Sequence, residues 1–394
     1  MSQDRIVIVD GSRTPVGKYV GALKSLSAHE LGAIAAASAI HRCGIATGDV
    51  DEVIMGCVGQ VGPDSYNARR VALAAGLPDS TPAFNVNRLC GSGLQAVWSA
   101  AQQLHWGGVE VILAGGNESM SQMPFLEFNA RGNPQLGDRS LVDGTLAMLT
   151  DPFSGRHMGV TAENVATKYE VSRREQDEFA LESQRRAGTA EAQAAFAEEI
   201  TPVQIAGKGA VTVIVDEHPR PDITMESLQA LGAAFKPGGS VTAGNSSGIN
   251  DGAAALVLMK ESTVRERGLG GLATLEHVAT AGIEPRLMGY APALALRKLF
   301  HETGLTTADI GTVELNEAFA AQAVAVMRDA KLDPEKTNPY GGAIALGHPL
   351  GATGAILTLR AAKDLARRGL EYGVVTMCIG GGQALAALIR RYEA

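Results

Sequence analysis

Cys90 has the sequence surroundings of a reactive cysteine. It follows an apolar run and precedes a glycine and serine turn, which opens an alanine-rich stretch ending at Trp106. Apolar residues at helical spacing predict a helix beginning at Gly91. The free amides and positive dipole of a helix N-terminus favour a thiolate over a thiol. We therefore interpret Cys90 as a candidate nucleophile, with a buried, inert cysteine as the alternative.

Three loops of the C-terminal part carry groups that would complete such a site. Asn316 follows a predicted strand, His348 precedes a predicted helix, and Cys378 comes before a glycine turn. Each residue type is also common as a cap or in a core. Together they indicate chemistry, because an imidazole near a cysteine supports a covalent acyl thioester. A second cysteine can exchange a proton with the substrate, and the amides of Cys90 and Gly380 can bind an oxyanion.

Short apolar strands alternate with helices along the N-terminal part. A capping box at Ser27 and Glu30 precedes one helix. We expect strands over 5–10, 49–57 and 109–114, and helices over 31–43, over 68–75 and from Gly91 onward. The alternation predicts an α/β fold with a largely parallel sheet covered by helices.

The C-terminal part repeats the N-terminal part at an offset of about 260 residues. Residues 309–313 resemble 49–53, the stretch from Gly351 resembles that from Cys90, and VVTMCIGG resembles VILAGG. A duplicated α/β unit is the simplest interpretation. Ligands bind beyond the carboxyl ends of such strands, so a pseudo-twofold relation would bring the candidate loops of both halves together.

The stretch between the two halves has a different composition, rich in Pro, Gly, Asp and Arg. We expect two helices and a hairpin-like piece there, with a capping box at Ser172 and Glu175. Long insertions of this kind commonly serve binding or assembly. We expect three domains: an N-terminal α/β half over 1–119 plus 241–270, an inserted loop domain over 120–240, and a C-terminal α/β half over 271–394.

Composition limits the class of partner. The 394 residues are 45% hydrophobic and 19% charged, which is ordinary for a packed soluble protein. The net charge of −8 argues against nucleic acid and anionic membranes as partners. No secretory signal or membrane-spanning run is visible, and the four scattered cysteines fit neither a zinc site nor a disulfide framework. We expect a cytoplasmic protein without a metal site.

The chain resembles the thiolases over essentially its whole length. The resemblance rests on VNRLCGSGLQA, GGNESMS, HMGVTAEN, AGNSSGINDGAAA, LNEAFAAQA, GGAIALGHPLGATGA and CIGGGQ. VNRLCGSGLQA and DPFSGRHMGVTAENVA look most like the bacterial acetoacetyl-CoA thiolases and β-ketothiolases of the biosynthetic type. The resemblance implies a duplicated, five-layered α-β-α-β-α thiolase fold with an inserted loop domain.

The activity implied by this resemblance is a reversible Claisen condensation of two acyl-CoA molecules, or thiolysis of a 3-ketoacyl-CoA in reverse. Cys90 would be the acylated nucleophile, His348 would activate it, and Cys378 would remove the α-proton of the incoming acetyl-CoA. Asn316 would hold a water that forms one oxyanion hole with His348. The amides of Cys90 and Gly380 would form the other. A thioester α-proton is too weakly acidic for a thiolate in water, so preorganised donors must stabilise the enolate.

Coenzyme A enters as substrate and product, so we expect no cofactor. A loop at 124–140 corresponds to the one that ties family dimers into homotetramers, and the implied role lies in lipid and fatty-acid metabolism. An arginine in a proline-rich loop, such as Arg220, is also commonly just solvated. The resemblance assigns to CoA Leu149, His157 and Met158 along the pantetheine tunnel, Arg220 and Ser227 at the adenine and phosphate end, and Ala243, Ser247, Ala318 and Phe319 near the thiol.

Three positions depart from the family pattern. Asn117 stands where many relatives carry Met, Ser246 replaces Ala, and Ala384 replaces Gly. None of them removes a catalytic group. Since Ala384 adjoins the Cys378 loop, chain-length preference or rate could differ.

Two alternatives stay open: a degradative 3-ketoacyl-CoA thiolase for medium or long chains, and a catalytically silent thiolase-like binding protein. A fatty-acid condensing enzyme is disfavoured because the partner loop offers Cys378 in place of the expected His or Asn. A Rossmann dehydrogenase is disfavoured because no acidic residue ends a strand at the required distance after IGGGQALAA.

Overall fold

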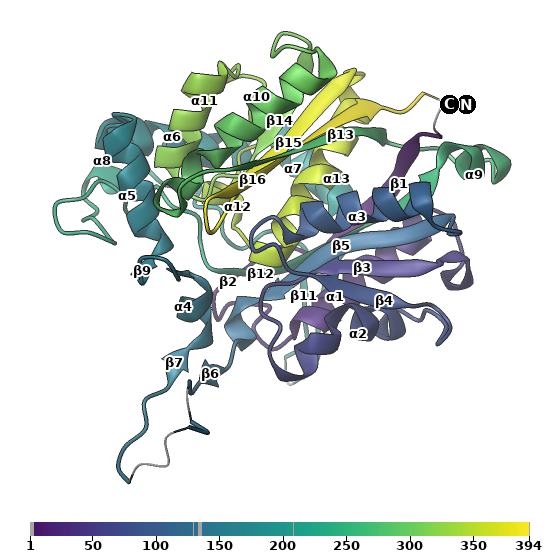
Figure 1. The fold of residues 1–394 in the computed structure, drawn as a ribbon, viewed down its shortest axis with the longest axis horizontal. Helices are drawn as coiled ribbons and strands as arrows, with labels where there is room; N and C mark the ends of the chain where they lie inside the picture. Colours follow the sequence, from purple (N-terminus) through teal and green to yellow (C-terminus); the bar gives the residue numbers. More distant parts are fainter. Residues whose placement is uncertain (1–3, 129, 133–135, 208, 394) are drawn as a thin grey trace.

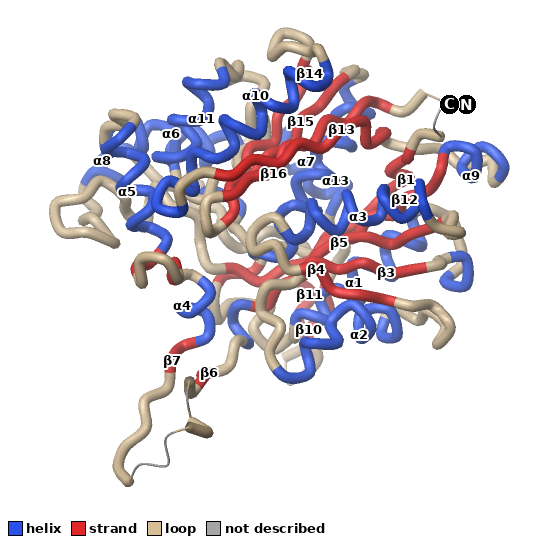
Figure 2. The backbone as a smooth tube through the Cα atoms, viewed as in Figure 1, coloured by secondary structure: helices blue, strands red, loops and turns tan. Residues whose placement is uncertain are grey.

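The apolar runs that the sequence marks as strands lie in two sets, joined in one hydrogen-bonded path (Figures 1 and 2). The computed structural model describes residues 4–128, 130–132, 136–207 and 209–393. The N-terminal set has the order β1-β12-β5-β3-β4 and the C-terminal set the order β13-β16-β15-β14. The strands are β1 (Ile6–Arg13), β2 (Gly17–Lys18), β3 (Glu52–Gly56), β4 (Ala83–Val86), β5 (Val111–Ser119), β12 (Asn250–Lys260), β13 (Ala273–Gly282), β14 (Ile310–Leu315), β15 (Tyr372–Ile379) and β16 (Gln383–Arg391).

The sheet is mixed, so the expectation of a largely parallel sheet was wrong. β3 runs parallel to β4 and β5, and β14 runs parallel to β15, whereas the other pairs along the path are antiparallel. β16 follows β15 through a tight turn in which Gly381 and Gly382 have φ angles of 79° and 83°. Such a turn reverses the chain, and an antiparallel pair follows. The two sets meet where β1 pairs with β13, for example at Ile8 and Ala273.

Helices cover the outer faces of both strand sets and fill the space between them. α1 and α2 cover the N-terminal strands, α10 covers β13 and β16 with α11 beside it, and α3 and α13 pack together in the middle. This order confirms the five-layered α-β-α-β-α architecture. The helices of these layers are α1 (Ala28–Arg42), α2 (Asn67–Ala74), α3 (Ser92–Trp106), α10 (Ala291–Thr303), α11 (Ala320–Ala330) and α13 (Leu350–Arg368).

Strand side chains alternate between the layers. On β1, Ile6 and Ile8 join the central core around α3 and α13, while Val7 and Val9 join the core beneath α1. This is the period of two expected of a strand buried on both faces. α13 is buried on nearly all sides between residues 350 and 365, since it touches strands of both sets.

The two halves repeat one unit, as the sequence predicts. β13, β16, β15 and β14 follow the order of β1, β12, β5 and β3. α13 takes the place of α3. An isolated parallel bridge between Val313 and Thr337 stands where β4 pairs with β3 in the first half.

The segment between residues 120 and 240 contains more helix than expected. Its described part holds five helices instead of two. Two of them, α4 and α8, have five residues each, too few for a periodic signal, and the expectation also omitted one of the three longer helices. The predicted capping box at Ser172 and Glu175 is present, as is a hairpin of β10 and β11. The elements are α4 (Gly144–Met148), α5 (Met158–Lys168), α6 (Arg173–Ala187), α7 (Ala190–Glu199), α8 (Met225–Gln229), β6 (Phe125–Leu126), β7 (Val142–Asp143), β8 (Thr150–Asp151), β9 (Arg156–His157), β10 (Val203–Ile205) and β11 (Val211–Val213).

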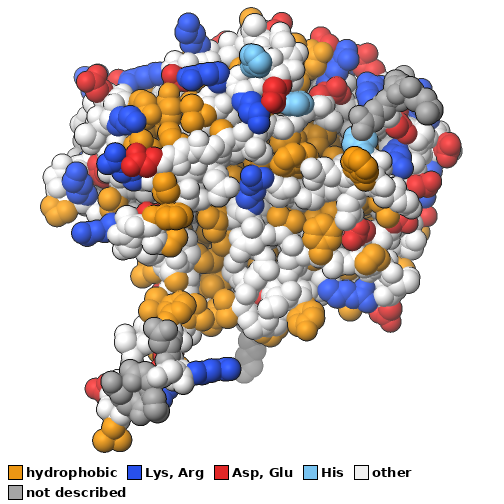
Figure 3. Space-filling view, in the orientation of Figure 1, with side chains coloured by type: hydrophobic (Ala, Val, Ile, Leu, Met, Phe, Trp, Pro, Cys, Tyr) orange, Lys and Arg blue, Asp and Glu red, His pale blue; other side chains and the backbone are white. Residues whose placement is uncertain are grey.

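An arm that starts at β6 and returns at β7 projects away from the layered body (Figure 1). Phe125 and Leu141 on this arm are 64% and 58% exposed. Hydrophobic side chains also gather on the surface where the arm joins the body (Figure 3). The predicted assembly loop 124–140 lies on this arm, and its residues 129 and 133–135 lie outside the described residues.

A buried ionic cluster ties the central segment to both halves. Arg13 of β1 donates to Glu199 at the end of α7 and to Asp216, at 2.7 Å in each case. Arg360 of α13 lies 3.4 Å from Glu199 and 3.8 Å from Glu314 of β14. The carboxylates around Arg13 raise its pKa despite burial.

The remaining helices are α9 (Glu261–Glu266) and α12 (Ala343–Leu346), together with 3₁₀ turns such as Pro285–Tyr290. Among the described residues, no helix combines the length and the apolar character that crossing a membrane requires.

Candidate active site

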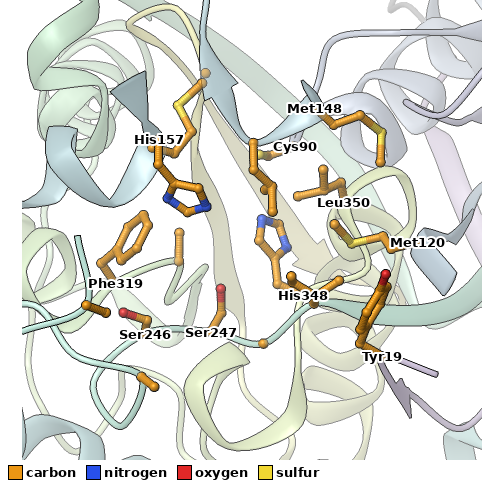
Figure 4. A pocket seen from close by; sticks show the side chains of 18 of the residues that line it. Tyr19, Cys90, Met120, Met148, His157, Ser246, Ser247, Phe319, His348 and Leu350 are labelled. Atoms are coloured by element: carbon orange, nitrogen blue, oxygen red, sulfur yellow. The ribbon is translucent and has the colours of Figure 1, made fainter. Parts of the chain in front are cut away.

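A cavity of about 550 Å³ opens where the two halves and the central segment meet. Cys90 and His348 lie in its middle, with His157 and Phe319 on one side and apolar side chains on the other (Figure 4). Of the predicted residues, those that line the cavity are Cys90, Leu149, His157, Met158, Arg220, Ala243, Ser247, Ala318, Phe319, His348, Cys378 and Gly380.

Cys90 lies in the turn between β4 and α3 and is half-buried. The turn is held by Ser92, whose hydroxyl donates to the backbone oxygen of Leu89 at 2.6 Å. A Cβ atom at Gly91 would lie 2.5 Å from the Cδ1 atom of Ile379, so the Cys90 turn packs closely against the end of β15. The tight turn thus sets Cys90 at the start of α3 and against the C-terminal half.

The resting thiol of Cys90 is neutral. Burial raises its pKa to about 11, and the negative charge of Glu118 also raises it, whereas the backbone N–H groups of Gly380 and of Cys90 lower it. The increase in the pKa of Cys90 that burial causes is therefore larger than the decrease expected from the helix N-terminus. Cys90 requires a base before it can act as a nucleophile.

The loop that carries His348 is held by two side chains of the N-terminal half. Asn250 of β12 accepts a hydrogen bond from the backbone N–H of His348 at 2.9 Å. Glu118 of β5 accepts one from the backbone N–H of Gly351 at 2.8 Å. The loop needs Gly347, whose φ is 98° and whose Cβ position would lie 2.6 Å from Asn250. The position of the imidazole is therefore set across the boundary between the halves.

The contacts of His348 define which ring nitrogen carries the proton. Nδ1 lies 2.6 Å from the hydroxyl oxygen of Thr353, and that hydroxyl donates its hydrogen to the backbone oxygen of Pro349 at 2.9 Å. The hydroxyl therefore accepts from Nδ1–H. On the other side, the Asn316 amide nitrogen, which can only donate, lies 3.4 Å from Nε2. Burial lowers the pKa of His348 to about 4, so the neutral ring presents Nε2 as an acceptor.

Asn316 follows β14 directly, and its backbone N–H donates to the backbone oxygen of Thr376 on β15 at 3.0 Å. Its side chain is fully buried and, unlike the other predicted catalytic residues, is not among those that line the cavity, although its amide contacts His348. Its Oδ1 atom has no hydrogen-bond partner among the described residues. A buried acceptor of this kind is suited to bind a water or a substrate group.

Cys378 lies near the end of β15, opposite Ala384 of β16. It is 1% exposed and lines the cavity. Burial raises the pKa of its thiol, and the neighbouring Cys90 raises it further. Two buried thiols therefore face one cavity, both in the neutral form at rest.

An aromatic wall runs from the cavity towards its mouth. The ring of His157 stacks on Phe235 at 4.7 Å, and Phe235 meets Phe319 edge to face at 6.0 Å. The Nδ1 atom of His157 accepts the backbone N–H of Gly159 at 3.0 Å, so Nε2 carries its proton. This wall suits a long, partly apolar ligand with an amide group.

One residue assigned to CoA lies away from the cavity. Ser227 is exposed on α8, where its hydroxyl donates to the backbone oxygen of Thr224 at 2.8 Å. Arg220 lies at the rim, and its backbone N–H donates to the side chain of Gln184 at 2.8 Å. The other residues assigned to CoA line the cavity.

Sequence-profile comparison assigns the two parts of the chain to known domains. The thiolase N-terminal domain matches residues 6–262 and the thiolase C-terminal domain matches residues 269–391. The chain is a thiolase.

Relatives of this thiolase match it over almost their whole length. The β-ketothiolase BktB of Cupriavidus necator is 47% identical over 389 residues, which is 98% of this chain and 99% of the relative. The acetyl-CoA acetyltransferase of Rhizobium meliloti is 47% identical over 393 residues, 99% and 100% of the two chains.

Solved structures also match this thiolase over almost their whole length. The Bacillus anthracis acetyl-CoA acetyltransferase has a TM-score of 0.96 at 42% identity and covers 99% of both chains. Human mitochondrial 3-ketoacyl-CoA thiolase also has a TM-score of 0.96 at 42% identity and covers 100% of both chains.

Two of the three departures in this thiolase are buried polar residues with partners. Asn117 exchanges two amide hydrogen bonds with Asn67 of α2, at 2.6 and 2.9 Å. Ser246 lines the cavity and donates to the backbone oxygen of Thr242 at 2.7 Å. A polar side chain is tolerated at each position because its hydrogen-bonding groups are satisfied.

Several residues of the thiolase cavity were not predicted. Met120 and Ser246 lie inside motifs that the sequence already marks, GGNESMS and AGNSSGIN, so those motifs could have identified them. The same holds for Leu89, Gly248, Ile249 and Leu350, which lie in VNRLCGSGLQA, AGNSSGIN and GGAIALGHPLGATGA. The others lie outside the quoted motifs. The unpredicted lining residues are Lys18, Tyr19, Leu89, Met120, Met148, His218, Ala234, Phe235, Ser246, Gly248, Ile249, Met288 and Leu350.

Proposed function

We propose that this thiolase catalyses the reversible Claisen condensation of acetyl-CoA with acetyl-CoA or another short acyl-CoA, giving a 3-ketoacyl-CoA and CoA. One observation carries the proposal. Cys90, His348, Cys378 and the backbone of Gly380 line a single cavity, although they come from three separate parts of the chain. A nucleophile, a base, a second thiol and an oxyanion donor are the groups that this two-step reaction needs.

In the first step, Nε2 of His348 takes the thiol proton of Cys90 as the sulfur attacks the acyl carbon of acetyl-CoA. The bond from that carbon to the CoA sulfur breaks, and the proton passes to the CoA thiolate. The N–H groups of Gly380 and Cys90, which already face the Cys90 sulfur, stabilise the tetrahedral oxyanion. The product is an acetyl thioester on Cys90.

In the second step, the thiol of Cys378 gives its proton to Nε2 of His348 and, as a thiolate, takes an α-proton from the incoming acetyl-CoA. The resulting enolate carbon attacks the acyl carbon on Cys90, and the bond to the Cys90 sulfur breaks. The Cys90 thiolate takes the proton held on His348, so both thiols and the neutral imidazole are restored. While it holds that proton, Nε2 of His348 would donate to the enolate oxygen, together with a water that the free Oδ1 of Asn316 would hold.

Coenzyme A is substrate and product here, and no other cofactor is required. The stacked rings of His157 and Phe235 would flank the pantetheine arm, with Leu149 and Met158 beside it. Ala243, Ser247, Ala318 and Phe319 would border the thiol end, and Arg220 at the rim would meet the phosphate end. We place this role in the predicted loop domain over 120–240, between the halves over 1–119 plus 241–270 and 271–394.

A short-chain preference is supported by the methionine and leucine side chains close to the reacting pair. Met120, Met148 and Leu350 stand beside Cys90 and His348 on the side away from the aromatic wall (Figure 4). Side chains of this size would limit the length of an acyl group next to the sulfur. The degradative 3-ketoacyl-CoA thiolase stays the second candidate, because the human mitochondrial enzyme is as similar in fold as the acetyl-CoA acetyltransferase.

The proposal is tested by thiolysis assays with acetoacetyl-CoA, 3-ketovaleryl-CoA and 3-ketooctanoyl-CoA, with Cys90→Ser as the control. Turnover of the two shorter substrates that the substitution abolishes would support the short-chain function. Preference for the eight-carbon substrate would favour the degradative class. Absence of turnover with all three would contradict the enzyme function and favour a silent binding protein.

We further propose a cytoplasmic homotetramer acting in fatty-acid and lipid metabolism. The four cysteines are free thiols, which suits a reducing compartment. The projecting arm, with Phe125 and Leu141 exposed, offers apolar surface for a second copy of the chain.

A further inference from the structure

Gln322 lies against the sulfur of Cys378. It is the third residue of α11 and is fully buried. One terminal atom of its amide lies 3.2 Å from Cys378 Sγ and 3.2 Å from the backbone oxygen of Asn316. The other terminal atom lies 2.7 Å from the backbone nitrogen of Ala323.

These contacts identify the two terminal atoms. The backbone oxygen of Asn316 can only accept, so the atom facing it is the amide nitrogen. The backbone N–H of Ala323 can only donate, so the atom facing it is the amide oxygen. The nitrogen carries two hydrogens, and the one not used by Asn316 is directed to the sulfur of Cys378.

We propose that Gln322 is a catalytic residue of this thiolase whose side-chain N–H donates to Cys378 and stabilises its thiolate. The inference rests on the proposed function, because it supplies the basic form of Cys378 that the condensation step needs. A hydrogen bond to a charged acceptor is stronger than one to a neutral acceptor, so the contact favours the thiolate over the thiol.

The surroundings of Cys378 explain why such a donor matters. Burial and the neighbouring Cys90 both act against the thiolate, and the backbone N–H of Cys378 itself favours it. The other titratable groups at the cavity centre are His348 and His157, and burial lowers the pKa of each, so neither ring is a cation at neutral pH. The Gln322 amide therefore supplies polar stabilisation that no neighbouring charge supplies.

The proton path follows from this contact. The Cys378 thiolate takes the α-proton of acetyl-CoA, the C–H bond breaks, and its electron pair forms the enolate. As the sulfur becomes a thiol, the Gln322 hydrogen bond weakens. In the thiolysis direction the same contact strengthens while Cys378 gives up its proton, so Gln322 affects proton transfer at carbon and leaves acyl transfer to Cys90 unaffected.

The first test measures the thiolate of Cys378 directly, without turnover. In a Cys90→Ser background, Gln322→Met replaces the amide by a side chain of similar length that cannot donate. We expect alkylation of Cys378 by iodoacetamide, followed by peptide mass spectrometry at about pH 8 to 10, to slow by about 10-fold or more. The matched control is Gln176→Met, which removes a buried glutamine of α6 that bonds to Val171 and Ser240.

The direction of the change in the alkylation rate of Cys378 tests the proposal. Slower alkylation in Gln322→Met, with Gln176→Met unchanged, supports a donor to the thiolate. Faster alkylation would mean that Gln322 accepts from the thiol, and an unchanged rate would mean that it makes no such contact; either result overturns the proposal. Because this readout needs no substrate, it stays informative even if the thiolase activity itself is not found.

A second test separates the two half-reactions in the otherwise unsubstituted chain. Gln322→Met should slow α-hydrogen exchange of acetyl-CoA by about 10- to 100-fold. Acetylation of Cys90 by acetyl-CoA should stay within about twofold of the unsubstituted rate. Equal slowing of both half-reactions would indicate a structural role and contradict the proposal.

Discussion

Cys90 and His348 each lie two residues before the first residue of a central helix, one in each half. α3 begins at Ser92 and α13 begins at Leu350. The two helices approach so closely that a Cβ at Gly93 would lie 2.7 Å from the backbone nitrogen of Ala355. Duplication of one α/β unit therefore places a nucleophile and a base at two helix starts that share one cavity.

The hydroxyl of Thr353 is predicted to set the tautomer of His348. Thr353→Val removes the acceptor of Nδ1–H and leaves a buried donor unpaired, which costs about 1–3 kcal/mol. We expect the rate of Cys90 acetylation by acetyl-CoA to fall about 10- to 100-fold. Thr353→Ser keeps the hydroxyl and should recover most of that rate. If Cys90 acetylation is as slow in Thr353→Ser as in Thr353→Val, the hydroxyl does not set the tautomer of His348.

The charge of Glu118 is predicted to hold the pKa of Cys90 up. Glu118→Gln removes a negative neighbour of the thiol, so the apparent pKa of Cys90 should fall below its value of about 11. The rate of Cys90 alkylation against pH measures this shift. The same substitution weakens the acceptor of the N–H groups of Val58, Gly59 and Gly351, and we expect a loss of about 1–3 kcal/mol in the free energy of unfolding. An unchanged or raised pKa would contradict this account.

The buried carboxyl of Glu314 is predicted to make the protein less stable as pH rises. Burial raises its pKa from 4.5 to about 8, although Arg360 acts in the opposite direction. Between these values the folded state holds a proton that the unfolded state has lost, so the free energy of unfolding falls with rising pH, by on the order of 2–4 kcal/mol. Neither oxygen of this carboxyl has a hydrogen-bond partner among the described residues.

Comparison with Glu314→Gln isolates this effect from that of other titrating groups. His348, for example, acts in the opposite direction, because its contribution to the free energy of unfolding increases as pH rises. Denaturant unfolding of both forms from about pH 5 to 9 should give a difference that grows in favour of the glutamine variant. A constant difference across this range would show that Glu314 is already ionised.

The exposed apolar residues of the arm are predicted to join two dimers. Phe125→Ser combined with Leu141→Ser removes apolar surface at β6 and next to β7, where the arm begins and returns, and neither residue lines the cavity. We expect light scattering after size exclusion to show a shift from tetramer to dimer, while thiolysis per chain stays within about twofold. Tetramers that survive both substitutions would place the contact elsewhere.

The sequence by itself predicted which groups would do chemistry. Cys90, Asn316, His348 and Cys378 stand in motifs long enough to mark them, and the offset between the halves predicted that their loops would meet. Strand and helix runs predicted an α/β fold with helices covering the sheet, because periods of 2 and 3.6 residues record which faces are buried. The five layers were implied by the family resemblance. The division into three domains stays a prediction from local composition alone.

Only the tertiary structure decided the sheet direction and the protonation of the site. Strand pairing depends on which segment returns beside β5 after the insertion, and local pattern does not carry that information. The low pKa of His348 and the high pKa of Cys90 arise from burial, while Thr353 and Gln322 act through contacts with His348 and with Cys378. Motifs name the reacting residues, but a pKa and a tautomer depend on every group packed around them, and folding alone brings those groups together.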